Sequence, residues 1–384
     1  FSGGYKQSDR FSYYYDPNRV DVRYPVEDPS RGLQTGNING ALEYRINREV
    51  SAYAEGGVNY GRFDTIGATA ILDLIGTSPQ TYVMAGLTSG WGGIRAFWNH
   101  FAADADLAGT QAYPLTLEND TIDVEGELAR EFDLVVHHNL HVGAGYRYKG
   151  IDWNLMPERR TEHHYSAFFQ DTMRLADAVS LVAGFRVDRH PLLEQLQFSP
   201  RGALVFRPTE ESAIRVSSGR AFRTQTFLES YLQTPFATTI PAINALGLGS
   251  YYRERLFGAE PLAPEQNVSS EIGYSMSTDT FTFDVAGYVN RVRDLIIQVP
   301  EVSPVTLSDV INNPSLGFDP SISAYTYGSS GHTNDPTVFT VYGGEASLRV
   351  FPVRGLDLYA NYALNKTHVS ENSERESERR TSLH

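Results

Sequence analysis

Hydrophobic and polar residues alternate with a period of two along most of this 384-residue chain. In the segment 140–148 Leu, Val, Ala and Tyr occupy the even positions, whereas His, Gly and Arg occupy the odd ones. The segments 180–188 and 281–290 repeat the pattern. Such alternation predicts half-buried β-strands, because successive side chains of a strand point to opposite faces. We count roughly fifteen such runs, the first at 1–13 and the last at 356–368, and no helical stripe of three turns.

The predicted connections alternate in length. Short turns with Pro, Gly, Asp or Glu are predicted near 47–49, 176–178, 208–211, 277–279 and 352–355. Long polar or Gly/Pro-rich segments lie between them, at 16–35, 63–80, 224–263 and 293–336. Short periplasmic turns and long extracellular loops are typical of an antiparallel transmembrane β-barrel. A soluble sandwich or propeller is the alternative, but we find no repeat of about 40–50 residues that would indicate propeller blades.

Composition removes several functional classes. The 46 acidic residues outnumber the 32 basic ones, giving a net charge of −14 and arguing against a nucleic-acid partner. Cysteine is absent, which excludes disulfides, thiolate metal sites and a cysteine nucleophile. No apolar run reaches the length of about 20 residues that a transmembrane helix needs, and the nearest, Ile66 to Ile75, contains Asp73.

Five segments of residues 163–296 follow one another in the order of a known family. They are 165–171 (YSAFFQD), 184–188 (GFRVD), 197–223 with QFSPRGALVFRPT and IRVSSGRAFR, 263–274 with APEQ and SEIGY, and 286–296 (AGYVNRVRDLI). This series resembles the barrel of TonB-dependent outer-membrane receptors. The resemblance implies a 22-stranded barrel filled by an N-terminal plug.

Nothing in the chain resembles that plug or a TonB box, and the strand count is odd. The chain also opens at Phe1 in a strand, without an initiator Met or a signal segment. We therefore expect residues 1–384 to be a partial barrel domain, about 15 of 22 strands, with the plug and the last strands missing. An unclosed barrel would leave two long strand edges, which lipid does not tolerate.

The resemblance also implies a function in the bacterial outer membrane. It implies active uptake of a scarce nutrient, with a ferric siderophore as the leading substrate and the TonB complex acting through the missing plug. Cobalamin, other metal chelates and oligosaccharides remain open, and outer-membrane lipid and lipopolysaccharide are the expected surroundings. The alternative is a passive porin or an adhesin-type barrel without a plug.

Charged residues on the polar face of the strands are the first candidate site. Glu271 shares this face with small polar neighbours, and family barrel glutamates at such positions pair with plug arginines, so a plug contact is implied; the alternative is a solvated lumen charge. Arg215 and Arg223 have the same parity on the preceding strand, as lumen partners for the plug or an anionic ligand. Arg220 and Phe222 are predicted to point outward.

The loop between Tyr231 and Phe257 is the second candidate site. Its aromatic and basic residues suit an aromatic or anionic iron chelate, although a loop packed on itself is an equal alternative. The candidate ligand-binding residues are Tyr231, Tyr251, Tyr252, Arg253 and Arg255. The predicted lipid-facing residues are Phe185, Phe206, Ile214, Ile272 and Phe283, and the predicted interfacial girdle comprises Trp91, Trp98 and Trp153.

Metal binding and catalysis are disfavoured. His137, His138 and His141 lie near a turn, and neighbours such as His137 and His138, or His163 and His164, point to opposite faces of a strand. Ser, His and Asp occur without a local signature such as G-x-S-x-G. We therefore predict no enzyme, no resident metal and no cofactor.

Overall fold

One large antiparallel sheet dominates the computed structural model, which describes residues 1–8, 33–66, 73–108, 113–238, 251–257, 262–302, 308, 312–313, 318–319, 324–326 and 329–370. The sheet has 15 strands in the order β1-β2-β3-β4-β5-β6-β7-β8-β9-β10-β11-β14-β15-β20-β21. Their bounds are β1 Ser2–Ser8, β2 Leu33–Arg45, β3 Val50–Ile66, β4 Asp73–Ser89, β5 Gly92–Ala108, β6 Tyr113–Asp133, β7 His137–Trp153, β8 Arg160–Ala176, β9 Val179–Arg189, β10 Gln197–Thr209, β11 Ser212–Arg223, β14 Glu265–Ser277, β15 Phe281–Arg293, β20 Phe339–Val353 and β21 Leu356–Val369.

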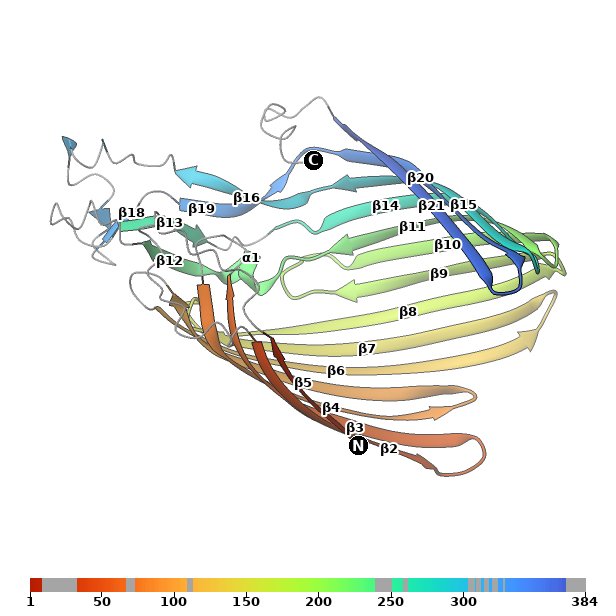
Figure 1. The fold of residues 1–384 in the computed structure, drawn as a ribbon, viewed down its shortest axis with the longest axis horizontal. Coiled ribbons are helices and arrows are strands. Elements are labelled where there is room, and N and C mark those ends of the chain that lie inside the picture. The colour runs from red at the N-terminus through yellow and green to blue at the C-terminus, as the bar shows by residue number, and fades with distance from the viewer. Residues whose placement is uncertain are drawn as a thin grey trace.

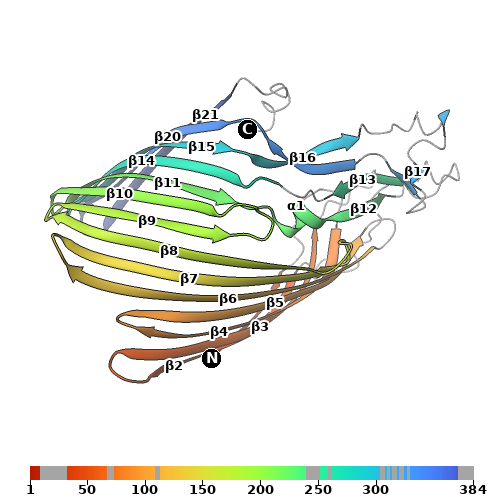
Figure 2. The ribbon, with the colours of Figure 1, turned by 180° about the vertical axis from the view of Figure 1, so that it is seen from behind.

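This sheet confirms the predicted antiparallel barrel wall and its number of strands. Strands that follow one another in sequence lie side by side, and the predicted short turns join β2 to β3, β8 to β9, β10 to β11, β14 to β15 and β20 to β21. Figures 1 and 2 show the sheet curved into a trough, with β1 and β21 at its two edges. The trough is the wall of an unclosed barrel.

Three of the four predicted long loops contain more structure than their polar composition indicated, and the fourth, 16–35, lies outside the described residues up to the start of β2 at Leu33. The segment 63–80 is mostly strand, since β3 ends at Ile66 and β4 begins at Asp73. The segments 224–263 and 293–336 carry a short helix, α1 (Phe227–Tyr231), and a second sheet at the end of the trough opposite the short hairpins (Figure 1). That sheet comprises β12 Gln233–Thr238, β13 Tyr251–Phe257, β16 Leu295–Val302, β17 Phe318–Asp319, β18 Ala324–Thr326 and β19 Ser329–Asp335.

The apolar face of the large sheet has no packing partner among the described residues. Ile272 is 59% exposed, and Phe185 and Phe206 are each 41% exposed. Ile214 and Phe283 are half-buried. They lie on the same face, because Phe206 is the register partner of Ile214, and Phe283 is the register partner of Met276, which shares its face with Ile272. Few large apolar side chains in the described ranges are buried: Ile151, Leu155, Met156, Leu193, Tyr231, Leu232 and Leu262. Apolar side chains therefore face outward over the wall instead of forming an enclosed core.

The opposite face mixes polar residues, glycines and aromatic rings. Gly143 and Phe168 are register partners on β7 and β8, and a Cβ atom at Gly143 would lie 2.3 Å from the Phe168 ring. The ring therefore covers the glycine backbone, an arrangement that stabilises glycines in curved sheets.

Among the described residues no helix is long and apolar enough to cross a membrane.

Candidate functional site

The polar face lines the concave side of the trough. The short helix α1 follows β11, yet its Tyr231 packs in a buried cluster with Ile151 of β7 and Met156. Three strands lie between β7 and β11, so α1 reaches Ile151 across the concave side, where the path over a curved sheet is shortest. Register partners on neighbouring strands point to the same face of a sheet. A series of such pairs through β8, β9, β10 and β11 shows that Glu271 on β14 shares its face with Lys149, which lies next to Ile151 on β7. Arg215, Arg223 and Glu271 therefore lie on the concave face.

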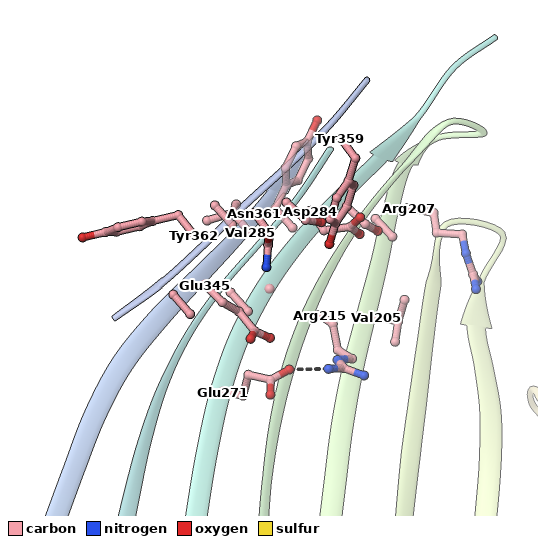
Figure 3. A pocket seen from close by; sticks show the side chains of 18 residues that line it. Val205, Arg207, Arg215, Glu271, Asp284, Val285, Glu345, Tyr359, Asn361 and Tyr362 are labelled. Carbon is pink, nitrogen blue, oxygen red and sulfur yellow. Dashed lines mark hydrogen bonds and ion pairs between the residues drawn. The ribbon is translucent and has the colours of Figure 1, made fainter. Parts of the chain in front are cut away.

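Arg215 and Glu271 form an ion pair within the barrel wall (Figure 3). Arg215 Nη2 donates to Glu271 Oε1 across neighbouring strands, and the side chains are 57% and 31% exposed. The pair lies beside a hollow of about 700 Å³ lined by residues of β10, β11, β14, β15, β20 and β21. The polar groups of the lining include Arg207, Ser275, Asp284, Glu345, Ser347 and Asn361. Sequence reasoning placed both charges on this face but missed that they neutralise each other.

Arg223 forms a different cluster at the loop end of β11. Its guanidinium donates to Glu265 Oε2 at 2.6 Å and Oε1 at 2.7 Å, and to Glu229 Oε2 at 2.9 Å and Oε1 at 3.0 Å. The two carboxylates are only 16% and 15% exposed, respectively. We call Arg223, Glu229 and Glu265 the rim clamp, because they tie α1 to the start of β14. The Arg223 side chain is thus committed to protein partners within the wall.

The rim clamp includes the N-terminal cap of α1. Glu229 Oε2 accepts from Thr226 N at 2.7 Å, and Glu229 N donates to Thr226 Oγ1 at 3.2 Å, which is a capping box. Burial raises the pKa of Glu229, but the hydrogen bonds from Arg223 and Thr226 outweigh burial and leave the pKa below its ordinary value. The motif Thr226-Phe227-Leu228-Glu229 was the sequence signal that could have revealed this helix start.

The second candidate site is divided between two elements. Tyr231 is 9% exposed, packs on Phe227 at a ring separation of 5.8 Å and lies under the Arg160 guanidinium, whose carbon is 4.6 Å from its ring centroid. Its ring is therefore packed inside the rim instead of being presented to a ligand. Tyr251, Tyr252, Arg253 and Arg255 share strand β13, which pairs with β12, and their side chains lie outside the described residues.

The tryptophans also divide between two environments. Trp98 is 36% exposed and donates from Nε1 to Asp120 Oδ1 at 3.2 Å on the outward face. Trp153 packs against the cluster of Ile151, Met156 and Tyr231 on the concave side. Trp153 therefore differs from the outward girdle position predicted for it.

Outward apolar side chains and a charged concave lining define the wall of a membrane-type β-barrel. A family model described as "TonB dependent receptor-like, beta-barrel" matches residues 2–381, and the chain belongs to this family. The match confirms the resemblance found in residues 163–296.

Several solved outer-membrane receptors share this fold. The siderophore receptor PirA from Pseudomonas aeruginosa is 15% identical with a TM-score of 0.68, and the match covers 88% of this chain and 57% of PirA. The ferric enterobactin receptor PfeA in complex with BCV-L6 is 17% identical with a TM-score of 0.65, covering 86% and 52% of the two chains. The alcaligin receptor FauA from Bordetella pertussis is 13% identical with a TM-score of 0.55, covering 88% and 54%.

This chain thus spans just over half the length of these receptors. No curated protein sequence matches it. At such low identities the similarity establishes the shared fold.

Proposed function

We propose that the protein takes up a ferric siderophore across the bacterial outer membrane, with energy supplied through TonB. The observation that carries the proposal is the wall itself, whose apolar face points outward and whose charged face lines the trough over nearly the whole family match. The fold neighbours named for siderophores, enterobactin and alcaligin support the substrate class. The family is one of receptors, and we propose no enzymatic reaction for this member.

In this proposal residues 1–384 supply part of the barrel domain. The concave lining then faces a plug domain on which TonB acts, and the outward face contacts lipid and lipopolysaccharide. A passive porin or an adhesin-type barrel is the competing function, since both would use the same outward face. The two readings differ in whether uptake needs energy.

Uptake in iron-starved cells tests the proposal. The full-length protein that contains residues 1–384 is expressed in a strain that lacks its own siderophore receptors, and radioactive iron uptake is measured with catecholate and hydroxamate ferric siderophores. We expect saturable uptake of at least one chelate, abolished in a matched strain without TonB. Uptake that persists without TonB would favour the passive barrel, and no uptake of any chelate would contradict the substrate class.

The lumen position of Glu271 yields a second prediction. Glu271→Gln keeps the volume and a carbonyl acceptor for Arg215 but removes the charge, so we expect looser plug packing without barrel unfolding. The measurement is leakage of large antibiotics into cells, which we expect to rise several-fold while the melting temperature stays unchanged. Glu345→Gln, which lines the same hollow, is the matched control. Unchanged leakage and uptake in Glu271→Gln would count against a plug contact.

A further inference from the structure

Three potential metal ligands converge on the concave side near the loop end of the wall. Glu162 and His164 are two residues apart on β8, so they share a face. His190 directly follows β9, whose last register pair with β8 joins Tyr165 to Arg189, so His190 reaches the same face beside His164. One ligand atom from each of the three side chains lies within 4.8 Å of the others.

The distances suit a single ion after small adjustments. His164 Nε2 is 2.9 Å from Glu162 Oε2, and His190 Nε2 is 3.9 Å from the same oxygen. The two imidazole rings meet edge to face, with centroids 4.5 Å apart. Tetrahedral coordination at about 2.1 Å places neighbouring ligand atoms roughly 3.4 Å apart. The observed separations lie on both sides of that value.

Burial leaves two atoms of this cluster unsatisfied. The side chains of Glu162 and His190 are 4% and 5% exposed, respectively. Within the described part of the chain, Glu162 Oε1 and His190 Nε2 are buried without a hydrogen-bond partner. Buried polar atoms without partners are costly, and a bound ion is one way to satisfy them.

Coordination would change the hydrogen bonding of His190. His190 Nδ1 accepts from Leu192 N at 3.2 Å. A neutral ring that binds metal through Nε2 carries its proton on Nδ1, so coordination replaces this single hydrogen bond. Lys149, the register partner of Glu162, is the neighbouring cation that a metal would compete with.

We propose that Glu162, His164 and His190 bind a divalent first-row transition-metal ion, with Zn²⁺ as the representative. Two imidazoles and one carboxylate suit Zn²⁺, Co²⁺, Ni²⁺ and Cu²⁺ better than Mg²⁺ or Ca²⁺. The ion would tie β8 to the connection after β9, close to the cluster on which α1 packs. This site does not depend on the proposed transport function.

The proposed site agrees with the sequence argument that His163 and His164 cannot share one metal ion. His163 lies on the other face, where its Nδ1 is 2.9 Å from the Tyr146 hydroxyl. The ligands that the sequence argument missed are Glu162, two positions before His164, and His190, which directly follows the next strand. His163 therefore provides a matched control that removes an imidazole without touching the proposed site.

Cobalt spectroscopy tests the proposal. The folded protein in detergent is stripped with a chelator and titrated with Co²⁺, whose visible absorption reports nitrogen and oxygen coordination, and Zn²⁺ is then added as competitor. We expect one equivalent of Co²⁺ to bind and Zn²⁺ to displace it. His164→Ala and His190→Ala should each weaken binding by at least about tenfold, whereas His163→Ala should leave it unchanged.

A stability readout guards against misfolded variants. Zn²⁺ should raise the melting temperature of the wild type and of His163→Ala but not of His164→Ala. If His190→Ala does not fold, His190→Gln replaces it, since the amide conserves polarity at the buried position. The proposal would be overturned if Co²⁺ did not bind specifically, or if the His164 and His190 variants bound Co²⁺ as tightly as the wild type does.

Discussion

Replacing Ile272 by Arg is expected to lower the free energy of unfolding of the barrel in lipid by about 2–4 kcal/mol. Ile272 lies in the middle of β14 on the outward face and is 59% exposed. Its register partners are Val216 on β11 and Gly287 on β15, so its surroundings offer no counter-charge on that face. A guanidinium there must leave water for hydrocarbon if the wall spans the membrane as proposed.

Urea unfolding in phospholipid vesicles measures this effect, and Ser275→Arg is the matched control. Ser275 is three positions further along β14 on the concave face, where it lines the hollow and has Asp284 as its register partner. We expect Ser275→Arg to leave stability nearly unchanged. In a soluble protein an exposed Ile-to-Arg change would be almost neutral, so equal stability of the two variants would reject the lipid-facing assignment.

The strands and their faces could be predicted because both follow from local side-chain order. Alternation fixes which residues share a face, and a slip by one residue would exchange the two faces entirely. The register of β11 against β14 runs without a shift from Ser212 to Arg223, so no bulge at Gly219 disturbs that parity. Glu271 and Arg215 consequently share the concave face, as their parity indicated.

Contacts between distant segments could not be predicted in the same way. Arg215 and Glu271 are 56 residues apart, and their pairing depends on β11 lying next to β14 across the whole segment 224–264. The second sheet arises inside segments predicted as long loops, and its pairings join strands far apart in the sequence, as where β13 pairs with β18 and β19. The ligand set of Glu162, His164 and His190 likewise requires the register of two strands.

Removing Arg223 is expected to destabilise the attachment of α1 by about 2 kcal/mol. Arg223→Ala would leave Glu229 and Glu265, 15% and 16% exposed, without their principal donor and facing each other as like charges. Amide hydrogen exchange of Phe227–Tyr231 measures the effect. We expect Arg223→Ala to speed up exchange in this helix relative to the wild type, and to do so more than in β7 or β8. Arg220→Ala, on the opposite face of the same strand, is the control and should leave exchange unchanged. Equal protection of α1 in both variants would show that the rim clamp does not hold the helix.

The same clamp should also lose its effect in acid. Because the pKa of Glu229 in the folded protein lies below its ordinary value of 4.5, the unfolded chain takes up a proton first as the pH falls. The stabilisation is therefore complete above pH 4.5 and declines as the pH falls through the lower value of the folded state. Exchange of α1 measured between neutral pH and pH 3, corrected for intrinsic rates, should show wild-type protection falling to the level of Arg223→Ala. The variant should itself change little over that interval, because the guanidinium that depresses the carboxylate pKa is gone. A wild-type protection that stays constant in acid would assign the anchoring of α1 to its apolar contacts with Ile151 and Met156 instead.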